Sequence, residues 1–226
     1  MKTTSTIAID GPVASGKTSV GIELAKQLGF RFIDTGLMYR AVTWAALRDN
    51  IDTSNQTHLT QLSSSLIIEL GPISDAGGDQ LPHILVDGSD VTAELRSSNV
   101  EASVSAISSI KGVRTAMVEQ QRKIAQHGKI VMVGRDITSV VLPTADLKIF
   151  LTASAENRAQ RRYEENLGTK KSKPLNEILA DLNRRDSLDI ERTDSPLTLS
   201  SDSILIDTTD MTKEKVVKYI INLVRS

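Results

Sequence analysis

The stretch Gly11-Pro12-Val13-Ala14-Ser15-Gly16-Lys17-Thr18 decides the fold of this 226-residue chain. It has the pattern G-x-x-x-x-G-K-[ST], with an apolar run, Thr6 to Ile9, before it and an amphipathic segment, Ser19 to Leu28, after it. Gly11 and Gly16 allow backbone angles that side chains disfavour, so consecutive N–H groups and a helix N-terminus can face an anion. A strand, this loop and a helix in that order predict a phosphate-binding loop.

Each part of the loop has an expected role in binding a nucleotide. Lys17 is expected to bridge the β- and γ-phosphates, and the Thr18 hydroxyl is expected to ligate the Mg²⁺ that travels with ATP. The alternative is an ordinary glycine-containing turn with an exposed lysine, which the flanking strand and helix disfavour. The residues predicted to bind the ATP phosphates are Gly11, Pro12, Val13, Ala14, Ser15, Gly16, Lys17, Thr18 and Ser19.

The composition favours a small-molecule partner. Lys and Arg number 27 against 28 Asp and Glu, and 3% of the residues are aromatic. Such a chain lacks the basic footprint and the stacking platforms of a nucleic-acid binder, so we expect no nucleic-acid partner.

The same composition bears on the compartment. The absence of cysteine excludes disulfides and thiolate metal sites and fits a reducing environment. The apolar stretch that ends at Asp10 is too short for a signal peptide, and no stretch approaches the roughly 20 apolar residues that span a bilayer. We expect a soluble cytoplasmic monomer with no membrane partner.

Five short apolar runs separated by helical segments predict an α/β fold with a central parallel five-stranded sheet flanked by helices. In such a fold ligands bind beyond the carboxyl ends of the strands, where Asp10, Asp34, Arg135 and Asp207 fall. The predicted strands are 6–9, 31–34, 130–133, 147–151 and 203–207, and the predicted helices are 19–28, 37–48, 113–126, 156–165, 176–188 and 212–224.

A segment of different character interrupts this alternation. Asn50 to Ser65 is rich in Ser, Thr and Asn, and Gly71 to Gly78 contains turn residues. Two apolar runs, Ile67 to Leu70 and His83 to Val86, and the turn pair Asp87-Gly88 follow the pattern of a small antiparallel element. We expect an inserted lobe on the side of the second substrate.

The second half of the chain is rich in arginine. Six of the fourteen arginines, namely Arg158, Arg161, Arg162, Arg184, Arg185 and Arg192, lie within 35 residues, and the polar connector Gly168 to Pro174 separates two helical segments there. Guanidinium groups suit a lid that neutralises a transferring phosphoryl group. The alternative is a solvated helix pair held by ion pairs, because the same segment contains seven acidic and nine basic residues.

Taken together, these segments resemble the cytidylate kinase family of P-loop nucleoside monophosphate kinases over nearly the whole chain. The segments that carry the resemblance are Ile9 to Thr18, Asp34-Thr35-Gly36-Leu37-Met38-Tyr39-Arg40, Val86 to Thr92, Leu95-Arg96-Ser97, Val113-Arg114, Gly134-Arg135-Asp136-Ile137, Arg158 to Arg162, Arg184 to Asp189, and Arg192. The resemblance implies a single domain, 1–226, with a core formed by 1–38, 104–157 and 189–226. It also implies a CMP-binding lobe at about 39–103, which includes the inserted segment, and a short lid at about 158–188.

The resemblance further implies transfer of the γ-phosphoryl group of MgATP to CMP or dCMP, giving CDP or dCDP and ADP. By the same resemblance, Lys17, Arg158, Arg161 and Arg162 are catalytic, with the three arginines closing over the γ-phosphate of the donor. The residues that the resemblance assigns to CMP are Arg40, Arg135 and Arg192 at the phosphate, Arg185 and Asp189 at the ribose, Ser105, Arg114 and Asp136 at the base, and Thr35 and Tyr39.

The chemistry of the base-reading residues agrees with cytosine. A carboxylate such as Asp136 accepts from the N4 amino group, and an arginine such as Arg114 donates to N3 and O2. Other interpretations stay open: Asp136 could pair with Arg135 or cap the turn after its strand, Ser105 could belong to a solvated helix face, and Tyr39 could be a packing residue.

The chain departs from the family pattern at three positions. Thr35 stands where the family usually has serine, and Val13 stands where a smaller loop residue is usual. Thr138 stands where the family often has a glycine directly after Gly-Arg-Asp-Ile. Thr35 keeps a hydroxyl, but its extra methyl group could narrow the tolerance for substrate variants.

Two other functions remain alternatives. A small P-loop kinase could act on AMP, UMP or a non-nucleotide alcohol, which the loop alone does not exclude, and Arg114 and Asp136 are the residues that discriminate between these acceptors and CMP. A GTP-binding switch is disfavoured because the chain has no Asn-Lys-x-Asp stretch for guanine.

Overall fold

A computed structural model describes residues 4–73, 82–169 and 172–225. The chain divides into two compact units, which we describe separately. Unit 1 comprises Met1–Arg31 and Lys129–Ser226, and unit 2 comprises Phe32–Gly128. The predicted lid, 158–188, lies within unit 1 and the predicted lobe, 39–103, lies within unit 2, and the expected domain division stays a prediction.

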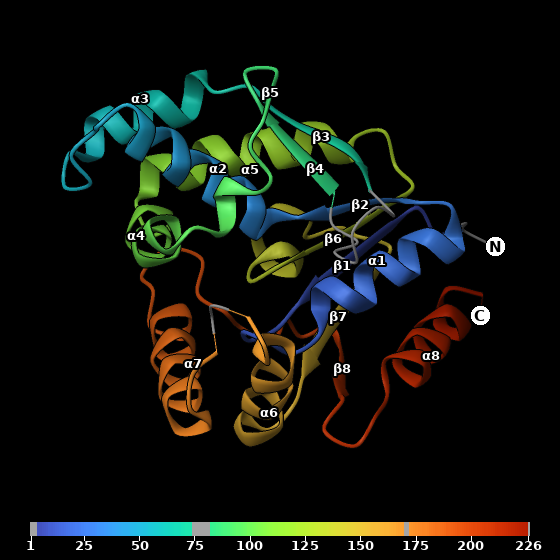
Figure 1. Cartoon of the computed structure of the whole chain (residues 1–226). Coiled ribbons are helices and arrows are strands. Elements are labelled where there is room, and N and C mark those ends of the chain that lie inside the picture. The colour runs from blue at the N-terminus through green and yellow to red at the C-terminus, as the bar shows by residue number, and fades with distance from the viewer. Residues whose placement is uncertain (1–3, 74–81, 170–171, 226) are drawn as a thin grey trace. The chain divides into compact units, whose positions relative to one another are not determined.

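A five-stranded sheet has the strand order β2-β6-β1-β7-β8, and the boundary between the units falls within β2 (Figure 1). The β1–β6, β1–β7 and β7–β8 pairs are all parallel, with Asp10 opposite Gly134 and Phe150. The strands are β1 (Thr6–Asp10), β2 (Arg31–Asp34), β6 (Ile130–Gly134), β7 (Leu147–Thr152) and β8 (Ile204–Asp207). The predicted parallel sheet is confirmed.

The central strands β1 and β6 are apolar and buried along almost their whole length, as strands covered on both faces of a sheet are. Ile7, Ile9, Ile130, Met132 and Ile149 are fully buried. Burial of such side chains stabilises the fold by about 1.5–3 kcal/mol each. The sheet therefore supplies a rigid platform at whose carboxyl edge loops can be held.

The helices of unit 1 are α1 (Lys17–Leu28), α6 (Ala155–Asn166), α7 (Leu175–Ile190) and α8 (Lys213–Arg225). Helix α1 begins two residues before the predicted start, directly at the loop lysine, and ends at Gly29 with φ 67°, as predicted. The amide of Lys215 donates to the Thr212 hydroxyl (3.4 Å), which supports the predicted N-cap. Residues 170 and 171 of the predicted connector lie outside the described residues.

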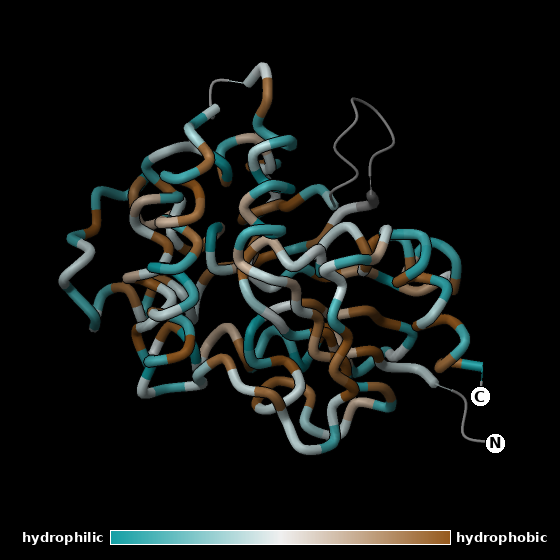
Figure 2. Tube along the Cα trace, turned by 90° about the horizontal axis from the view of Figure 1, so that it is seen from below, coloured by the Kyte–Doolittle hydropathy of each residue, from teal (hydrophilic) through white to brown (hydrophobic). Residues whose placement is uncertain are grey.

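Helix α8 is amphipathic, and it packs against α1. Its buried residues are Val216, Val217, Ile220 and Ile221. Figure 2 shows hydrophobic and hydrophilic residues alternating along the tube toward the C-terminal end. No helix within the described part of the chain is long and apolar enough to cross a membrane.

Unit 2 contains a small antiparallel sheet, as predicted, in the order β3-β4-β5. Asp87 and Gly88 join β4 to β5 with φ of 50° and 79°, the positive values that a two-residue hairpin requires. Gly71, predicted to begin a turn, instead lies in β3, and residues 74–81 of that predicted turn region are outside the described residues. The elements are α2 (Thr35–Arg48), α3 (Gln56–Ser65), β3 (Ile68–Ile73), β4 (Pro82–Val86), β5 (Ser89–Asp90), η1 (Glu94–Arg96), α4 (Ser98–Ser108) and α5 (Lys111–Ala125).

Helix α3 is a feature that the sequence interpretation missed. Asn55 starts it by accepting from the His58 amide (3.0 Å), and Leu59 and Ser63 are buried on one face. The Ser, Thr and Asn residues that suggested an irregular segment therefore form an N-cap and a solvated helix face. Packing against α5 stabilises this polar helix.

Candidate functional site

The phosphate loop of unit 1 leaves the carboxyl end of β1 with three left-handed residues. Gly11, Ala14 and Gly16 have φ of 152°, 58° and 90°. A Cβ atom at Gly11 would lie 2.0 Å from the carbonyl oxygen of Leu151, so the loop passes too close to β7 for any side chain there. A loop in which residues with positive φ stand among residues with negative φ turns successive amide groups toward one concave side, which is the geometry of an anion-binding nest.

Lys17 is held inside this loop. Its side chain is buried, and Nζ donates to the carbonyl oxygens of Gly11 (2.7 Å) and Pro12 (2.6 Å) and to the Ser15 hydroxyl (3.2 Å). The alternative of an exposed lysine in an ordinary turn is therefore excluded. A buried ammonium beside helix α1's N-terminus makes the loop strongly attractive to phosphate oxygens.

Thr18 follows Lys17 in the first turn of α1 and is half-buried. A hydroxyl oxygen is a hard donor of the kind that Mg²⁺ prefers, and Mg²⁺ in kinases is held by substrate phosphates and one or two protein oxygens. The donor set at the loop therefore fits a Mg²⁺ ion that arrives with the nucleotide. Within the described ranges, no group of three His, Asp or Glu residues forms a separate metal site.

Asp10, at the end of β1, holds the segment that follows β6. Its carboxylate accepts from the amides of Ile137 (2.8 Å) and Thr138 (2.7 Å) and from the Thr138 hydroxyl (2.7 Å). Burial raises the pKa of Asp10 above its usual value, whereas these hydrogen bonds lower it and the nearby charge of Asp136 adds a smaller increase. Thr138 thus binds the buried carboxylate, and its hydroxyl also contacts that of Ser200 (2.9 Å).

Asp136 lies at the start of this segment and is buried. It is the N-cap residue of a π-helical turn, η2 (Ile137–Val141), but its side chain makes no capping hydrogen bond there. The neighbouring Arg135 forms an ion pair with Asp189 (2.7 Å). The alternative in which Asp136 caps this turn is therefore not observed.

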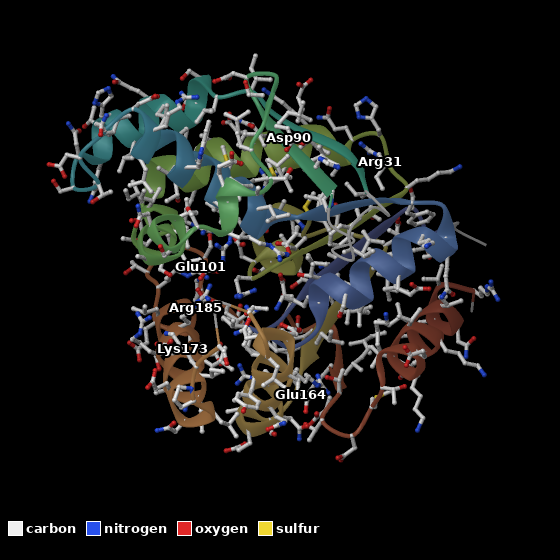
Figure 3. The ribbon with its side chains drawn as sticks, in the orientation of Figure 1. Arg31, Asp90, Glu101, Glu164, Lys173 and Arg185 are labelled. Atoms are coloured by element: carbon white, nitrogen blue, oxygen red, sulfur yellow. The ribbon has the colours of Figure 1, made fainter. Side chains whose placement is uncertain are left out.

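Two arginines predicted for CMP contact Asp189, itself a residue predicted for CMP, in unit 1. Arg135 Nε contacts one carboxylate oxygen of Asp189 at 2.7 Å, and Arg192 Nη2 contacts the other at 3.0 Å. Arg185 lies one helical turn earlier on α7 (Figure 3), and its side chain is half-buried. Two guanidinium groups fixed on one carboxylate form a cationic site at the end of β6, with the geometry that suits a phosphate group.

The three arginines predicted to close over the γ-phosphate have different surroundings. Arg158 is buried and its Nη1 contacts Asp186 (2.6 Å), Arg161 Nη1 donates to the Thr208 hydroxyl (3.1 Å), and Arg162 pairs with Glu165 on its own helix (3.1 Å). The Arg162–Glu165 ion pair is more exposed than the Arg158–Asp186 ion pair, and an exposed pair contributes little to stability. Arg158 is therefore buried, whereas Arg161 and Arg162 are half-buried.

Unit 2 contains the other residues predicted for CMP. The guanidinium of Arg114 lies over the ring of Tyr39, 5.4 Å from its centroid, and Nη1 donates to the carbonyl oxygen of Ser108 (3.2 Å). Both side chains are buried, so they hold each other in place through a cation–π contact. Tyr39 thus packs within the unit against a predicted base-reading residue, and its hydroxyl is buried rather than at the surface.

The remaining predicted residues of unit 2 lie on α2 and α4. Arg40 Nη1 donates to the carbonyl oxygen of Leu95 (3.1 Å), and its Nη2 lies 3.7 Å from Glu101. Thr35 is buried at the start of α2, and Ser105 is half-buried on α4, the helix that also provides Ser108.

The structure adds residues that sequence reasoning did not assign. Asp186 links α7 to the phosphate loop through Val13 and Arg158, and Ser200 joins the Asp10–Thr138 group. Asp186 lies in a segment that carries the family resemblance but was given no role, because it is one acid among several on a charged helix, and Ser200 lies in a polar loop.

Comparison with known proteins assigns the chain to a family. A sequence model described as "Cytidylate kinase" matches residues 7–226. A cytidylate kinase of Caldanaerobacter subterraneus subsp. tengcongensis is 46% identical over 221 residues, which are 97% of this chain and 94% of that protein. A cytidylate kinase of Mycolicibacterium paratuberculosis is 44% identical over 220 residues, which are 97% of this chain and 94% of that protein.

Solved structures with low sequence identity share the fold. An uncharacterized protein from Eubacterium ventriosum superposes with a TM-score of 0.56 at 13% identity, covering 98% of this chain and 99% of that one. A gluconokinase from Sinorhizobium meliloti superposes with a TM-score of 0.50 at 14% identity, covering 100% of this chain and 94% of that one. At such identities the likeness concerns the fold alone, whereas the sequence matches over 7–226 show that this chain belongs to the cytidylate kinase family.

Proposed function

We propose that this protein transfers the γ-phosphoryl group of MgATP to CMP or dCMP, giving ADP and CDP or dCDP, in pyrimidine nucleotide metabolism. The observation that carries the proposal is the cationic site in which Arg135 and Arg192 share Asp189 at the end of β6. Paired guanidinium groups suit an acceptor that is itself a phosphate, rather than an alcohol. The names of the relatives agree with a CMP acceptor.

The donor binds at the phosphate loop in this proposal. In this proposal residues 11–19 surround the phosphates. The amides from Ala14 onward and the Lys17 ammonium bind them, and the Thr18 hydroxyl would hold Mg²⁺. When bound, that ion neutralises charge on the phosphate oxygens and orients the transferring group. Lys17 is already buried against the loop carbonyls, so its charge is oriented before the nucleotide arrives.

The acceptor contacts are assigned residue by residue in this proposal. We assign the CMP phosphate to Arg40, Arg135 and Arg192, the ribose hydroxyls to Arg185 and Asp189, and further contacts to Thr35 and Tyr39. The pairing of Asp189 with two arginines supports this assignment, because it fixes the orientation of a carboxylate that would accept from a ribose hydroxyl.

The base is read by Ser105, Arg114 and Asp136 in this proposal. Asp136 is buried and, as a carboxylate, accepts from the N4 amino group of cytosine. Uracil would present a carbonyl oxygen to the same carboxylate and leave both groups without a hydrogen bond. Because buried unpaired groups are costly, CMP should be preferred over UMP.

The reaction is an in-line transfer that needs positioning and charge neutralisation. The phosphate oxygen of CMP is anionic near neutral pH, so it attacks without a dedicated general base. Lys17, Arg161 and Arg162 would stabilise the charge on the transferring group, with closure of the arginine-bearing helices excluding water. Arg158 was predicted to join them, and its buried contacts suggest the different role developed below.

A coupled assay of ADP release tests this function, with CMP, dCMP, UMP, AMP and shikimate as acceptors at equal concentration. We expect CMP and dCMP to give the highest kcat/KM, with UMP at least about tenfold lower. Faster turnover with AMP or shikimate than with CMP would rule out the proposed acceptor. The monomeric state and the cytoplasmic location stay predictions from the sequence.

A further inference from the structure

Val13 of the phosphate loop is bound at both its amide and its carbonyl by side chains from the arginine-rich segment. Its N–H donates to Asp186 Oδ1 (3.1 Å), and its carbonyl oxygen accepts from Arg158 Nη1 (2.9 Å). The same Nη1 contacts Asp186 Oδ2 at 2.6 Å. We call these three residues the Val13 network.

The side chain of Val13 adds an apolar contact to the same link. It is buried in a cluster with Ala159 of α6 and with Ile178 and Leu182 of α7. Helices α6 and α7 lie side by side in Figure 1, and they pack together. The loop is therefore attached to both helices by packing as well as by hydrogen bonds, which explains why valine rather than a smaller residue suits this position.

The Val13 network adjoins a strained part of the loop. Ala14, the next residue, has φ 58°, a conformation that is unfavourable for a residue with a side chain. Such a conformation persists where the surroundings fix the neighbouring backbone. Here the hydrogen bonds to the N–H and to the carbonyl of Val13 fix the two peptide units on either side of that residue. The N–H of Val13, which was predicted to face phosphate, is instead directed at Asp186.

The charges of the network have opposite effects on a nucleotide. Asp186 brings a buried carboxylate to a loop that binds polyphosphate, and an unpaired carboxylate there would repel the ligand through a medium of low dielectric constant. Arg158 is also buried, and its Nε is fixed by the carbonyl oxygen of Ala153 (3.0 Å). The guanidinium is therefore held in place to neutralise the carboxylate.

We infer that Asp186 and Arg158 are positioning residues for donor binding: Asp186 orients the Val13 peptide of the phosphate loop, and Arg158 neutralises Asp186. This assignment replaces the predicted contact of Arg158 with the γ-phosphate. It rests on the proposed function only for the choice of ATP as the donor.

The two roles of Arg158 predict opposite outcomes for a double variant. If Arg158 neutralises Asp186, Arg158→Met leaves an unpaired carboxylate at the loop, and adding Asp186→Asn removes that charge while its amide oxygen can still accept from Val13 N–H. Donor binding should then recover in part. If Arg158 instead contacts the γ-phosphate directly, the second substitution does not replace the lost contact, and the double variant should bind no better than Arg158→Met.

The experiment is calorimetric titration of the full-length chain with the magnesium complex of the non-hydrolysable analogue AMP-PNP. We expect Asp186→Asn to weaken binding about tenfold and Arg158→Met about 30-fold, with the double variant binding more tightly than Arg158→Met alone. Asp202→Asn is the matched control, because Asp202 pairs with Lys148 in the same unit and should leave the dissociation constant unchanged.

A spectroscopic measurement separates loop positioning from general stability. The Val13 amide proton in ¹H–¹⁵N spectra should move upfield in Asp186→Asn, because a carboxylate acceptor is replaced by a neutral amide. Arg158→Lys, which retains the charge, provides a second variant if Arg158→Met does not fold, and it should bind AMP-PNP more weakly than wild type.

Two results would overturn the inference. They are AMP-PNP binding by Asp186→Asn with wild-type affinity, and a double variant that binds no better than Arg158→Met. If the wild-type protein fails to phosphorylate CMP, the proposed function fails, whereas these titrations still decide the role of the Val13 network because they measure donor binding alone.

Discussion

The substitution Gly11→Ala tests whether the close approach of the phosphate loop to β7 determines the architecture of the site. A Cβ atom at this position would lie 2.0 Å from the carbonyl oxygen of Leu151, 3.0 Å from its carbonyl carbon and 3.1 Å from the Ser15 hydroxyl. The first two atoms belong to the backbone of β7, one residue beyond the partner of Asp10, so they cannot move without disturbing the sheet. The alanine can be accommodated only if the loop leaves its position.

The magnitude follows from two contributions. A side chain at φ 152° costs on the order of 1–3 kcal/mol, and overpacking against the backbone costs a further ~1–3 kcal/mol, so the free energy of unfolding should fall by about 2–6 kcal/mol. Gly29→Ala is the matched control, because Gly29 also has a positive φ, 67°, but nothing lies within 4 Å of its added Cβ. It should cost only the backbone contribution of about 1–2 kcal/mol.

Urea unfolding of both variants measures the difference. Far-UV circular dichroism reports on the whole chain, whereas the fluorescence of Trp44, the single tryptophan, reports on unit 2. Gly11→Ala should lower the circular dichroism transition more than the fluorescence transition, because the disturbed strand and loop belong to unit 1. It should also abolish AMP-PNP binding. Equal stability of the two variants, or unchanged binding by Gly11→Ala, would refute the steric reasoning.

Three further predictions concern catalysis, specificity and pH. Lys17→Met should lower kcat by at least about a hundredfold with an unchanged circular dichroism spectrum, and a kcat close to wild type would remove Lys17 from the mechanism. Asp136→Asn should reduce the preference in kcat/KM for CMP over UMP by about tenfold or more, and an unchanged preference would mean that Asp136 does not read the base. The pKa of Asp90, which lies in β5 (Figure 3), is lowered from 3.8 to about 2, chiefly by the hydroxyl and amide of Thr92 and then by His83. A lowered pKa contributes stability that is present above pH 3.8 and is lost as the pH falls through about 2. In Asp90→Asn the midpoint of the Trp44 unfolding transition should therefore depend less on pH in that window. A pH dependence of the midpoint equal to that of wild type would contradict this.

Sequence patterns predicted those parts of the fold that a few neighbouring residues determine by themselves. Runs such as Ile130 to Val133 are apolar at every position, which a strand buried on both faces requires. Gly29 and the Asp87-Gly88 pair occupy positions where positive φ is needed, so their residue types indicate the helix end and the hairpin directly. Helix α3 lacks such a cause, because its apolar face is small and its polar residues are common in loops.

The candidate site was predictable to the extent that single residues determine its chemistry. Lys17 lies in the loop, as the pattern indicates, and Asp189 forms ion pairs with two of the arginines that were predicted to bind phosphate. The pairing of Arg158 with Asp186 was not predictable, because a charged helix offers several acids and only the tertiary packing of α6 against α7 selects one. An arginine within a charged segment can therefore be a buried structural partner rather than a ligand for phosphate.

The most direct test of the proposed activity is ³¹P nuclear magnetic resonance of the purified chain mixed with CMP, ATP and Mg²⁺, with Lys17→Met as the matched blank. We predict that CDP and ADP appear at equal rates, without inorganic phosphate, and that the blank remains nearly silent. Formation of ADP with inorganic phosphate while CMP persists would contradict the assignment of CMP as the acceptor.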